Sequence, residues 1–249
     1  MSQRHAFITG AGGGIGRATA EALAASGVKL TLAARNTERL QKVATALGAH
    51  AVTADVTSEE SIADAMAAAR AKHGFVNILI NNAGIALSAP FHKTSLALWN
   101  ETLATNLTGA FLCAQAALPD MRAAGWGRIV NVASAAALKG YAYVSAYCAS
   151  KHGLLGMTRA LAQETAKDGV TVNAVCPGFV DTDIVSQSAA RIAATTNLSA
   201  DDARATLAAF NPQQRLIKPR EVAAAIAWLC SDEAAATNGA AIPITGGEI

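Results

Sequence analysis

Three side chains of this sequence stand at spacings that suit proton transfer to a carbonyl oxygen. Tyr147 and Lys151 are four residues apart, so a helix would present the phenol and the ammonium on one face. Ser134 lies thirteen residues before Tyr147, at the end of an apolar run that is typical of a strand. Reduction of a ketone creates an alkoxide, which a phenol can protonate while a hydroxyl donates to the carbonyl oxygen. These residues therefore predict an acid–base site for interconverting ketones and alcohols.

A glycine-rich turn follows the first apolar run and precedes a helical pattern. It reads Thr-Gly-Ala-Gly-Gly-Gly-Ile-Gly over 9–16. Glycines let the backbone approach a diphosphate closely, and the free N–H groups of a helix start supply partial positive charge. Because the strand and the helix both flank the turn, we predict a dinucleotide site here. Its expected contacts are Gly10, Gly13, Gly14, Ile15 and Gly16.

The second predicted strand ends without the acidic residue that commonly binds the ribose 2′-hydroxyl of NAD. The chain reads Leu-Ala-Ala-Arg-Asn-Thr over 32–37. Arg35 could hold a 2′-phosphate in a bidentate fork, with Arg17 and Asn36 as helpers. We therefore predict NADP(H) as the preferred cofactor and NAD(H) as the second possibility. The alternative is that Arg35 is an ordinary exposed residue.

Two further strand ends carry polar residues. Asp55 follows the third predicted strand, where its carboxylate could accept from an adenine amino group or cap the next helix. The fourth strand ends in Ile-Asn-Asn-Ala-Gly over 80–84, whose small and amide-bearing side chains can both satisfy loop backbone and pass close to a flat adenosine.

The direction of proton transfer depends on the pKa of Tyr147. A free phenol has a pKa of about 10 and is a poor base at neutral pH. We expect the charges of Lys151 and an oxidised nicotinamide to lower that pKa by about 2 to 3, or about 3 to 4 kcal/mol. The alternative is a surface aromatic beside a solvated lysine, since a Tyr–Lys pair at this spacing also arises by chance.

Short apolar runs alternate along the chain with segments of 3.6-residue periodicity, which is typical of βαβ units around a parallel sheet. We predict an α/β fold: a doubly wound Rossmann fold whose seven-stranded parallel sheet has helices on both faces. The predicted strands cover 6–9, 29–34, 49–53, 77–81, 128–133, 171–175 and 240–244. The predicted helices cover 16–25, 38–47, 58–72, 96–124, 146–167 and 219–231.

A chain of 249 residues is near the upper limit for one hydrophobic core, and no repeat or linker divides it. We therefore expect a single domain over 1–249. Segment 184–214 is Ala-rich and has no strand pattern. It lies beyond a strand end, where a substrate lid would be found, and a plain helical excursion is the alternative.

Composition excludes several other classes of protein. The net charge is only +2, and basic residues form no run that would suit nucleic acid or an anionic membrane surface. No apolar run reaches the ~18 residues that cross a bilayer, and no leader pattern opens the chain, so we expect a cytoplasmic protein. No metal site is expected, because the four cysteines lie far apart and suit small buried positions. They are Cys113, Cys148, Cys176 and Cys230.

Taken together, these motifs resemble the short-chain dehydrogenase/reductase family over essentially the whole chain. The resemblance rests on the turn at 9–16, Asp55, Asn-Asn-Ala-Gly at 81–84, Asn-Leu-Thr-Gly at 106–109, Ser134, Tyr147 with Lys151, and Pro-Gly at 177–178.

The resemblance implies a catalytic tetrad. Tyr147 would be the general acid/base, Ser134 would orient the carbonyl, and Lys151 would lower the pKa of Tyr147 and bind the nicotinamide ribose. Asn106 would hold a water in a proton relay. From the residues alone, Asn106 is only a polar residue in an apolar helical segment, where a tolerated kink is the usual interpretation.

The resemblance also implies cofactor contacts beyond the glycine-rich turn, and a homotetramer packed through 96–124, 146–167 and the last strand and helix. The implied contacts are Arg35, Asp55, Val56, Asn82, Ala83, Gly84, Tyr147, Lys151, Pro177, Gly178, Val180 and Thr182.

The substrate pocket is expected to be mostly apolar. Its candidate residues are Ala86, Ala136, Leu138, Tyr141, Phe179, Ile184 and the segment up to Asn211. A neutral ketone or secondary alcohol suits such a pocket, and no Arg or Lys is clearly placed to receive a small dicarboxylate. Overall similarity favours reductases of ketones or 3-oxoacyl thioesters. Tyr141 could instead pack under the lid.

Two other functional classes compete with this interpretation. A Rossmann-like domain can serve as a catalytically idle nucleotide-binding regulator or scaffold. A nucleotide-sugar epimerase normally needs a longer C-terminal substrate region than the three residues that follow Gly246 here.

Overall fold

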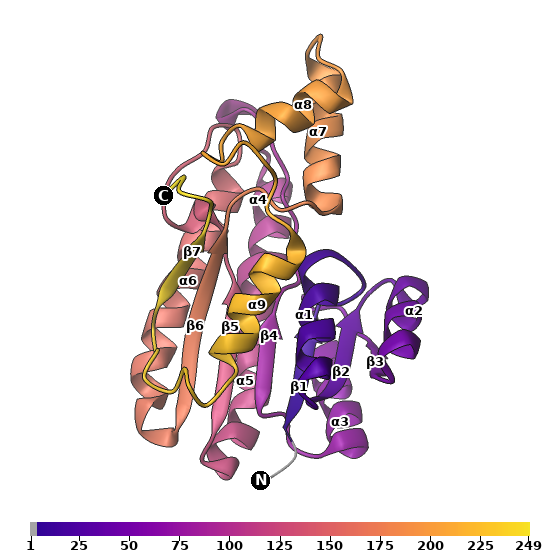
Figure 1. Cartoon of the computed structure of the whole chain (residues 1–249), viewed down its shortest axis with the longest axis vertical. Coiled ribbons are helices and arrows are strands. Elements are labelled where there is room, and N and C mark those ends of the chain that lie inside the picture. Colours follow the sequence, from indigo (N-terminus) through magenta and orange to yellow (C-terminus); the bar gives the residue numbers. More distant parts are fainter. Residues whose placement is uncertain (1–3) are drawn as a thin grey trace.

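The structure, a computed structural model, describes residues 4–249 and contains a seven-stranded, all-parallel sheet (Figure 1). The spatial order is β3-β2-β1-β4-β5-β6-β7, so the direction of winding reverses between β1 and β4. In such sheets ligands bind at the carboxyl ends of the strands beside the reversal. The predicted fold class is confirmed. The strands are β1 His5–Thr9, β2 Lys29–Ala34, β3 His50–Thr53, β4 Ile78–Asn81, β5 Gly127–Val132, β6 Val170–Pro177 and β7 Ala241–Ile244.

Helices cover both faces of the sheet, with α1 against α9 on one face and α3 against α5 on the other (Figure 1). The helices are α1 Gly14–Ala25, α2 Thr37–Leu47, α3 Glu59–His73, α4 Leu96–Leu103, α5 Gly109–Ala124, α6 Ser145–Thr165, α7 Asp183–Thr195, α8 Ala200–Ala208 and α9 Pro219–Leu229.

Successive strand residues feed two separate cores. In β1, Ile8 packs in the core under α1 and α9, whereas Phe7 packs in the core under α3 and α5. Side chains alternate between the faces of a strand, so a sheet covered on both sides needs apolar residues at every position. This requirement explains the continuous apolar runs that mark the strands in the sequence.

Short polar side chains set the start of three helices. The Ser58 hydroxyl accepts from the N–H of Ser61 at 3.2 Å and caps α3, and the Ser95 hydroxyl accepts from Leu98 at 3.1 Å and caps α4. The Asn36 side chain caps α2 by accepting from the N–H of Arg39 at 2.9 Å. Each cap satisfies a backbone donor that the first turn of a helix leaves free.

The long helix predicted over 96–124 is interrupted. A π-helical turn, Ala104–Thr108, separates α4 from α5. Such a turn inserts one residue and rotates the side chains that follow, which is a common device at functional sites. The turn contains Asn106, which is buried.

Segment 184–214 folds as α7 and α8, which rise above the carboxyl edge of the sheet (Figure 1). The two helices pack on each other through a small apolar cluster of their own, with Val185 and Ala189 facing Ala203 and Leu207. Phe179 and Leu216, from the segments before α7 and after α8, pack against this cluster and connect the pair to the rest of the chain.

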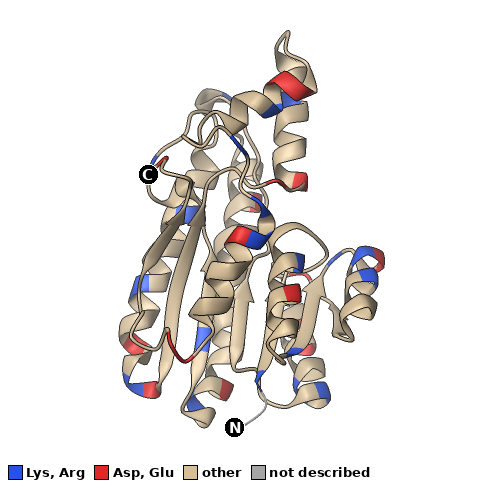
Figure 2. Cartoon of the chain, viewed as in Figure 1, with Lys and Arg blue, Asp and Glu red and all other residues tan. Residues whose placement is uncertain are grey.

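Lys and Arg are interspersed with Asp and Glu over the helices and loops, and the strands of the sheet carry few charges (Figure 2). No helix within residues 4–249 is long and apolar enough to cross a membrane. Of the four cysteines, three are buried as expected and Cys148 is half-buried.

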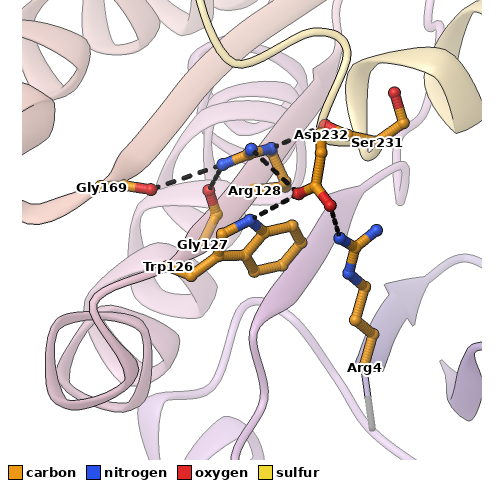
Figure 3. A network of polar contacts seen from close by, with 7 residues as sticks. All are labelled: Arg4, Trp126, Gly127, Arg128, Gly169, Ser231 and Asp232. Carbon is orange, nitrogen blue, oxygen red and sulfur yellow. Dashed lines mark hydrogen bonds and ion pairs between the residues drawn. The ribbon is translucent and has the colours of Figure 1, made fainter. Parts of the chain in front are cut away.

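A polar network lies at the amino ends of β1 and β5, at the opposite end of the sheet from the glycine-rich turn (Figure 3). The guanidinium carbons of Arg4 and Arg128 lie 4.5 and 4.4 Å from the centre of the Trp126 ring, and the Trp126 indole donates to Asp232 at 3.0 Å. The Arg128 side chain is buried, and it also donates to three backbone carbonyls. These belong to Gly127, Gly169 and Ser231.

We expect Arg128→Met to lower the free energy of unfolding by about 2 to 4 kcal/mol, because buried carbonyls lose their donor. Urea unfolding followed by circular dichroism measures the change. The matched control is Arg4→Met, whose exposed pair with Asp232 should cost less than about 1 kcal/mol. Equal losses in the two variants would contradict the assigned role of Arg128.

Candidate active site

The glycine-rich turn forms an open cradle at the start of α1. Gly10 and Gly14 have φ of +64° and +53°, which L side chains rarely adopt. A Cβ at Gly16 would lie 2.5 Å from the Gly10 carbonyl oxygen, so the helix and the turn approach too closely for a side chain. Gly13 caps α1 without a side-chain hydrogen bond, and a Cβ built on it meets nothing within 4 Å. The exposed N–H groups and open space fit a diphosphate.

Asn82 holds this cradle in place. Its side-chain amide donates to the carbonyls of Thr9 and Gly10 at 3.0 and 3.1 Å. In return, the Thr9 hydroxyl accepts from the N–H groups of Asn82 and Ala83, both at 3.0 Å. The predicted role of this amide in satisfying loop backbone is confirmed.

Arg35 is exposed directly after β2, and Asp55 is half-buried after β3. The Asp55 carboxylate accepts from the N–H and hydroxyl of Thr57 at 2.9 and 2.8 Å. These hydrogen bonds, with a smaller contribution from the charge of Arg35, hold the pKa of Asp55 below its usual range. The capping alternative for Asp55 is wrong, because Ser58 caps α3.

The two predicted helpers of Arg35 have other partners. Asn36 caps α2, and Arg17 pairs with Glu21 one turn along α1 at 2.8 Å. Another cation, Arg39 of α2, lies beside the turn, with its Cβ 3.6 Å from a Cβ built on Gly12. Its guanidinium pairs with Asp183 at 2.6 Å.

The structure brings the carboxyl end of β6 beside the cradle. The Thr182 side chain lies 3.0 Å from a Cβ built on Gly14, and Gly178 donates its N–H to Ile244 at 3.1 Å. Pro177 and Val180 are buried.

The side chains of two predicted cofactor contacts, Val56 and Ile15, pack against other parts of the chain, which leaves their backbone groups for the cofactor. The Val56 side chain packs against Gly109, at 2.8 Å from a Cβ built there. The Ile15 side chain packs against the core beneath α1.

Ser134, Tyr147 and Lys151 meet at the carboxyl end of β5. Ser134 follows the strand, and its hydroxyl accepts from the Ala136 N–H at 3.1 Å. Tyr147 and Lys151 lie on α6, with the Lys151 ammonium 5.7 Å from the centre of the Tyr147 ring. That ammonium is buried and donates to the Val132 carbonyl at 2.8 Å. The three groups of the predicted acid–base site are therefore neighbours.

The pKa of Tyr147 is shifted in the opposite direction from the expected lowering. Burial raises the pKa of Tyr147, and the hydrogen bond with the Ser134 side chain opposes that rise. Burial also lowers the pKa of Lys151 to about 8. The effect of burial is larger than that of the Ser134 hydrogen bond, so the chain by itself favours the neutral phenol. That is the form that donates a proton.

Asn106 links the loop after β4 to α6. Its amide oxygen accepts from the Ile85 N–H at 2.8 Å, and its amide nitrogen donates to the Ile85 carbonyl at 2.9 Å and the Ser150 hydroxyl at 3.1 Å. Ser150 donates in turn to the Tyr147 carbonyl at 2.8 Å. A Cβ on Gly84 would lie 3.2 Å from the Asn106 oxygen, so glycine lets the loop pass.

An aromatic cluster stands beside Gly178. Tyr141, Phe179 and Phe210 have ring centres 5.2 to 6.1 Å apart. Tyr141 donates to the carboxylate of Glu248 at 2.5 Å, and this bond with burial raises its pKa strongly. Tyr141 is thus both a packing residue and a hydrogen-bond donor.

Glu248 is a residue that the sequence reading missed. Its side chain is only 3% exposed, and it pairs with Lys139 at 2.9 Å. Its other carboxylate oxygen, Oε2, has no partner within residues 4–249 and lies 3.2 Å from a Cβ built on Gly178. The expected pocket was mostly apolar, whereas its observed surroundings include this ion pair. No local pattern at 248 signals the return of the chain end to Tyr141.

The remaining pocket candidates divide by exposure. Ala136 is buried, and Leu138 packs partly against the apolar cluster of Leu154 and Leu155. Ile184 is exposed on α7, where it is free of the core.

Comparisons with known proteins agree with this geometry. The family model described as short chain dehydrogenase matches residues 4–193. The chain is 41% identical to cis-4-hydroxycyclohexanecarboxylate dehydrogenase of Sinomonas cyclohexanicum, over 99% of this chain and 97% of the relative. It is 37% identical to the 3-oxoacyl-(acyl-carrier-protein) reductase of Escherichia coli (strain K12), over 97% and 96% of the two chains.

Solved structures extend the similarity to the fold. A crystal structure of a variant of actinorhodin polyketide ketoreductase with NADPH has a TM-score of 0.96 and 35% identity, covering 99% of this chain and 97% of that one. The crystal structure of levodione reductase has a TM-score of 0.93 and 34% identity, covering 98% and 97%.

Proposed function

The chain belongs to the short-chain dehydrogenase family and is an NAD(P)-dependent oxidoreductase that acts on CH–OH groups; on that premise, we propose that it interconverts ketones and secondary alcohols through Tyr147. The observation that carries the proposal is the meeting of Ser134, Tyr147 and Lys151 at the carboxyl end of β5, with the buried ammonium 5.7 Å from the phenol ring. A structural role alone gives little reason to bury, next to a phenol, an ammonium that has no carboxylate partner within residues 4–249.

Each member of the group has one task in the proposed reaction. When bound along the cradle, a nicotinamide dinucleotide supplies or accepts the hydride. Ser134 donates to the substrate carbonyl oxygen and orients it, and Tyr147 passes its proton to that oxygen as negative charge develops. The charge of Lys151 stabilises the phenolate that remains. In the direction of alcohol oxidation the same phenolate takes the proton back.

Asn106 supports the proton relay to Tyr147 in this proposal. Its side chain is bonded to Ile85 and to Ser150, and Ser150 is bonded to the Tyr147 backbone. It thereby fixes the loop after β4 against the helix that carries the proton donor.

The substrate classes to test first are ring ketones and 3-oxoacyl thioesters. The relatives are named for a hydroxycyclohexanecarboxylate and for a 3-oxoacyl carrier-protein thioester, and the aromatic cluster near Gly178 suits an apolar ring or chain. The test follows the absorbance of NADPH with a panel of both classes. Turnover of a ketone supports the proposal, and no turnover of any ketone or thioester contradicts it.

We also propose NADPH as the preferred cofactor. Arg35 is exposed after β2, and no carboxylate follows it before the start of α2 to repel a 2′-phosphate. Arg35→Gln is expected to raise the KM for NADPH by about 10- to 100-fold, since a charged fork is lost, and to leave the KM for NADH unchanged.

Steady-state kinetics with both cofactors tests this prediction. The matched control is Lys42→Gln, which removes an exposed cation paired with Glu38 on the neighbouring helix and should change neither constant. A wild-type preference for NADH would contradict the assignment to Arg35.

The same resemblance supports a homotetramer of single-domain subunits. Phe111 on α5 is 47% exposed and Trp228 on α9 is 45% exposed, although both are large apolar side chains. Burial of such residues is typical of subunit interfaces, and both lie on the elements expected to pack between subunits.

A further inference from the structure

Arg191 is the unusual cation of α7. One of its terminal nitrogens donates to the Ala86 carbonyl at 2.7 Å and to the Ser188 hydroxyl at 3.3 Å. Its Nε is buried and has no hydrogen-bond partner within residues 4–249. Because Nε is closed to solvent, the donor of Arg191 that is open to a ligand is its second terminal nitrogen, which has no partner in the described part of the chain.

Four other cations of the chain have carboxylate partners, and one of these partners is Asp183, the first residue of α7. Arg204 pairs with Asp181, Arg39 with Asp183, Lys139 with Glu248 and Arg215 with Glu221, at 2.6 to 2.9 Å. No ion pair within residues 4–249 includes Arg191, although Asp183 lies about two turns earlier on the same helix. The segment therefore carries one positive charge without a counter-ion.

The guanidinium faces the loop that borders the proposed reaction site. Ala86 directly follows Ile85, whose backbone is held on both sides by Asn106. Asn106 is bonded through Ser150 to the backbone of Tyr147. Arg191 thus connects α7 to the loop that Asn106 fixes beside the helix carrying Tyr147.

We propose that Arg191 is the receptor for a carboxylate on the substrate. The proposal deepens the proposed function and rests on it: the preferred substrates are oxo or hydroxy acids whose carboxylate lies on the far side of the molecule from the reacting carbon. An Arg keeps its charge at any working pH, and the second terminal nitrogen of Arg191, which has no hydrogen-bond partner within residues 4–249, can donate a charge-assisted hydrogen bond to a carboxylate. The sequence had indicated no cation clearly placed to receive a small dicarboxylate, and the proposal departs from that expectation.

The first test measures binding, which does not depend on turnover. Calorimetry with the NADP⁺-loaded protein compares cyclohexanecarboxylate with cyclohexanecarboxamide, which has the same ring and no charge. The wild type should bind the carboxylate more tightly, and Arg191→Gln should weaken that binding by about 10- to 100-fold while leaving the carboxamide unchanged. Arg191→Lys keeps the charge and should retain part of the preference.

The second test measures catalysis with 4-oxocyclohexanecarboxylate and 4-methylcyclohexanone. Arg191→Gln should lower kcat/KM for the acid by about 10- to 100-fold through KM, and leave the neutral ketone unchanged. The matched control is Arg204→Gln, an arginine of α8 paired with Asp181, which should preserve the preference for the acid.

Three results overturn the proposal: no carboxylate preference in the wild type, equal losses for charged and neutral ligands in Arg191→Gln, or the same loss in Arg204→Gln. Equal losses would make Arg191 a latch between α7 and the loop at Ala86. Arg191-dependent carboxylate binding without reduction of any ketone would support the receptor and refute the proposed reaction, so the two failures are distinguishable.

Discussion

Replacement of Tyr147 by Phe is expected to lower kcat for ketone reduction by about 10³-fold or more, with cofactor affinity unchanged. The substitution removes only the phenolic oxygen, which is the atom that passes a proton to the carbonyl oxygen in the proposed reaction. General acid catalysis by a positioned group contributes about 10² to 10⁴ in rate. Single-turnover kinetics with NADPH and a reactive ketone measures the loss, and fluorescence titration with NADPH measures cofactor binding.

The control for this experiment is Tyr141→Phe, because Tyr141 is a second half-buried phenol near the site. Its hydroxyl donates to Glu248 and not toward Ser134, so this variant should retain turnover. A Tyr147→Phe enzyme with full activity would refute the proton donor. A Tyr141→Phe enzyme as inactive as Tyr147→Phe would show that the assignment between the two phenols is wrong.

Replacement of Lys151 by Met is expected to lower kcat/KM by about 10²- to 10³-fold, as the loss of a preorganised charge does elsewhere. The substitution removes the cation nearest the Tyr147 ring and leaves the Val132 carbonyl without its donor. The phenolate that forms during proton transfer would then have no positive charge beside it. Cofactor affinity should fall as well, because the resemblance gives Lys151 a contact with the nicotinamide ribose.

The pH profile separates the charge of Lys151 from its packing. Burial lowers the pKa of Lys151 to about 8, so the side chain is charged at pH 7 and loses its proton as pH rises through about 8. In the wild type, kcat/KM for reduction should therefore fall on the alkaline side of about pH 8. Lys151→Arg keeps its charge above that pH, so its remaining activity should lack this decline. An unchanged alkaline decline in Lys151→Arg would show that another group titrates.

The fold followed from patterns that are local in the sequence. The strands were predicted from apolar runs of strand length, and the cradle from glycines such as Gly10 and Gly14, which permit positive φ. Both features belong to short segments, so they can be recognised without knowing any tertiary contact. The Tyr147–Lys151 spacing is equally local, because one helix carries both residues. Ser134 was found because parallel strands place their carboxyl ends at one edge.

Other features depend on which distant segments meet. The π-helical turn that points Asn106 at Ile85 and Ser150 has no signature in the residues of 104–108, which read as ordinary helix. The approach of Glu248 to Tyr141, across more than a hundred residues, is likewise set by the path of the chain end. Asn36 and Arg17 were predicted near the cofactor, but local hydrogen bonds to Arg39 and Glu21 engage them.

The sequence by itself determined the family of folds, the cradle and the three groups of the acid–base site, because glycine conformations and periodic burial act over a few neighbouring residues. Only the tertiary structure decided the protonation preference of Tyr147 and the unpaired state of Arg191. Desolvation and ion pairing depend on every group that packs around an atom, and most of those groups lie far away along the chain.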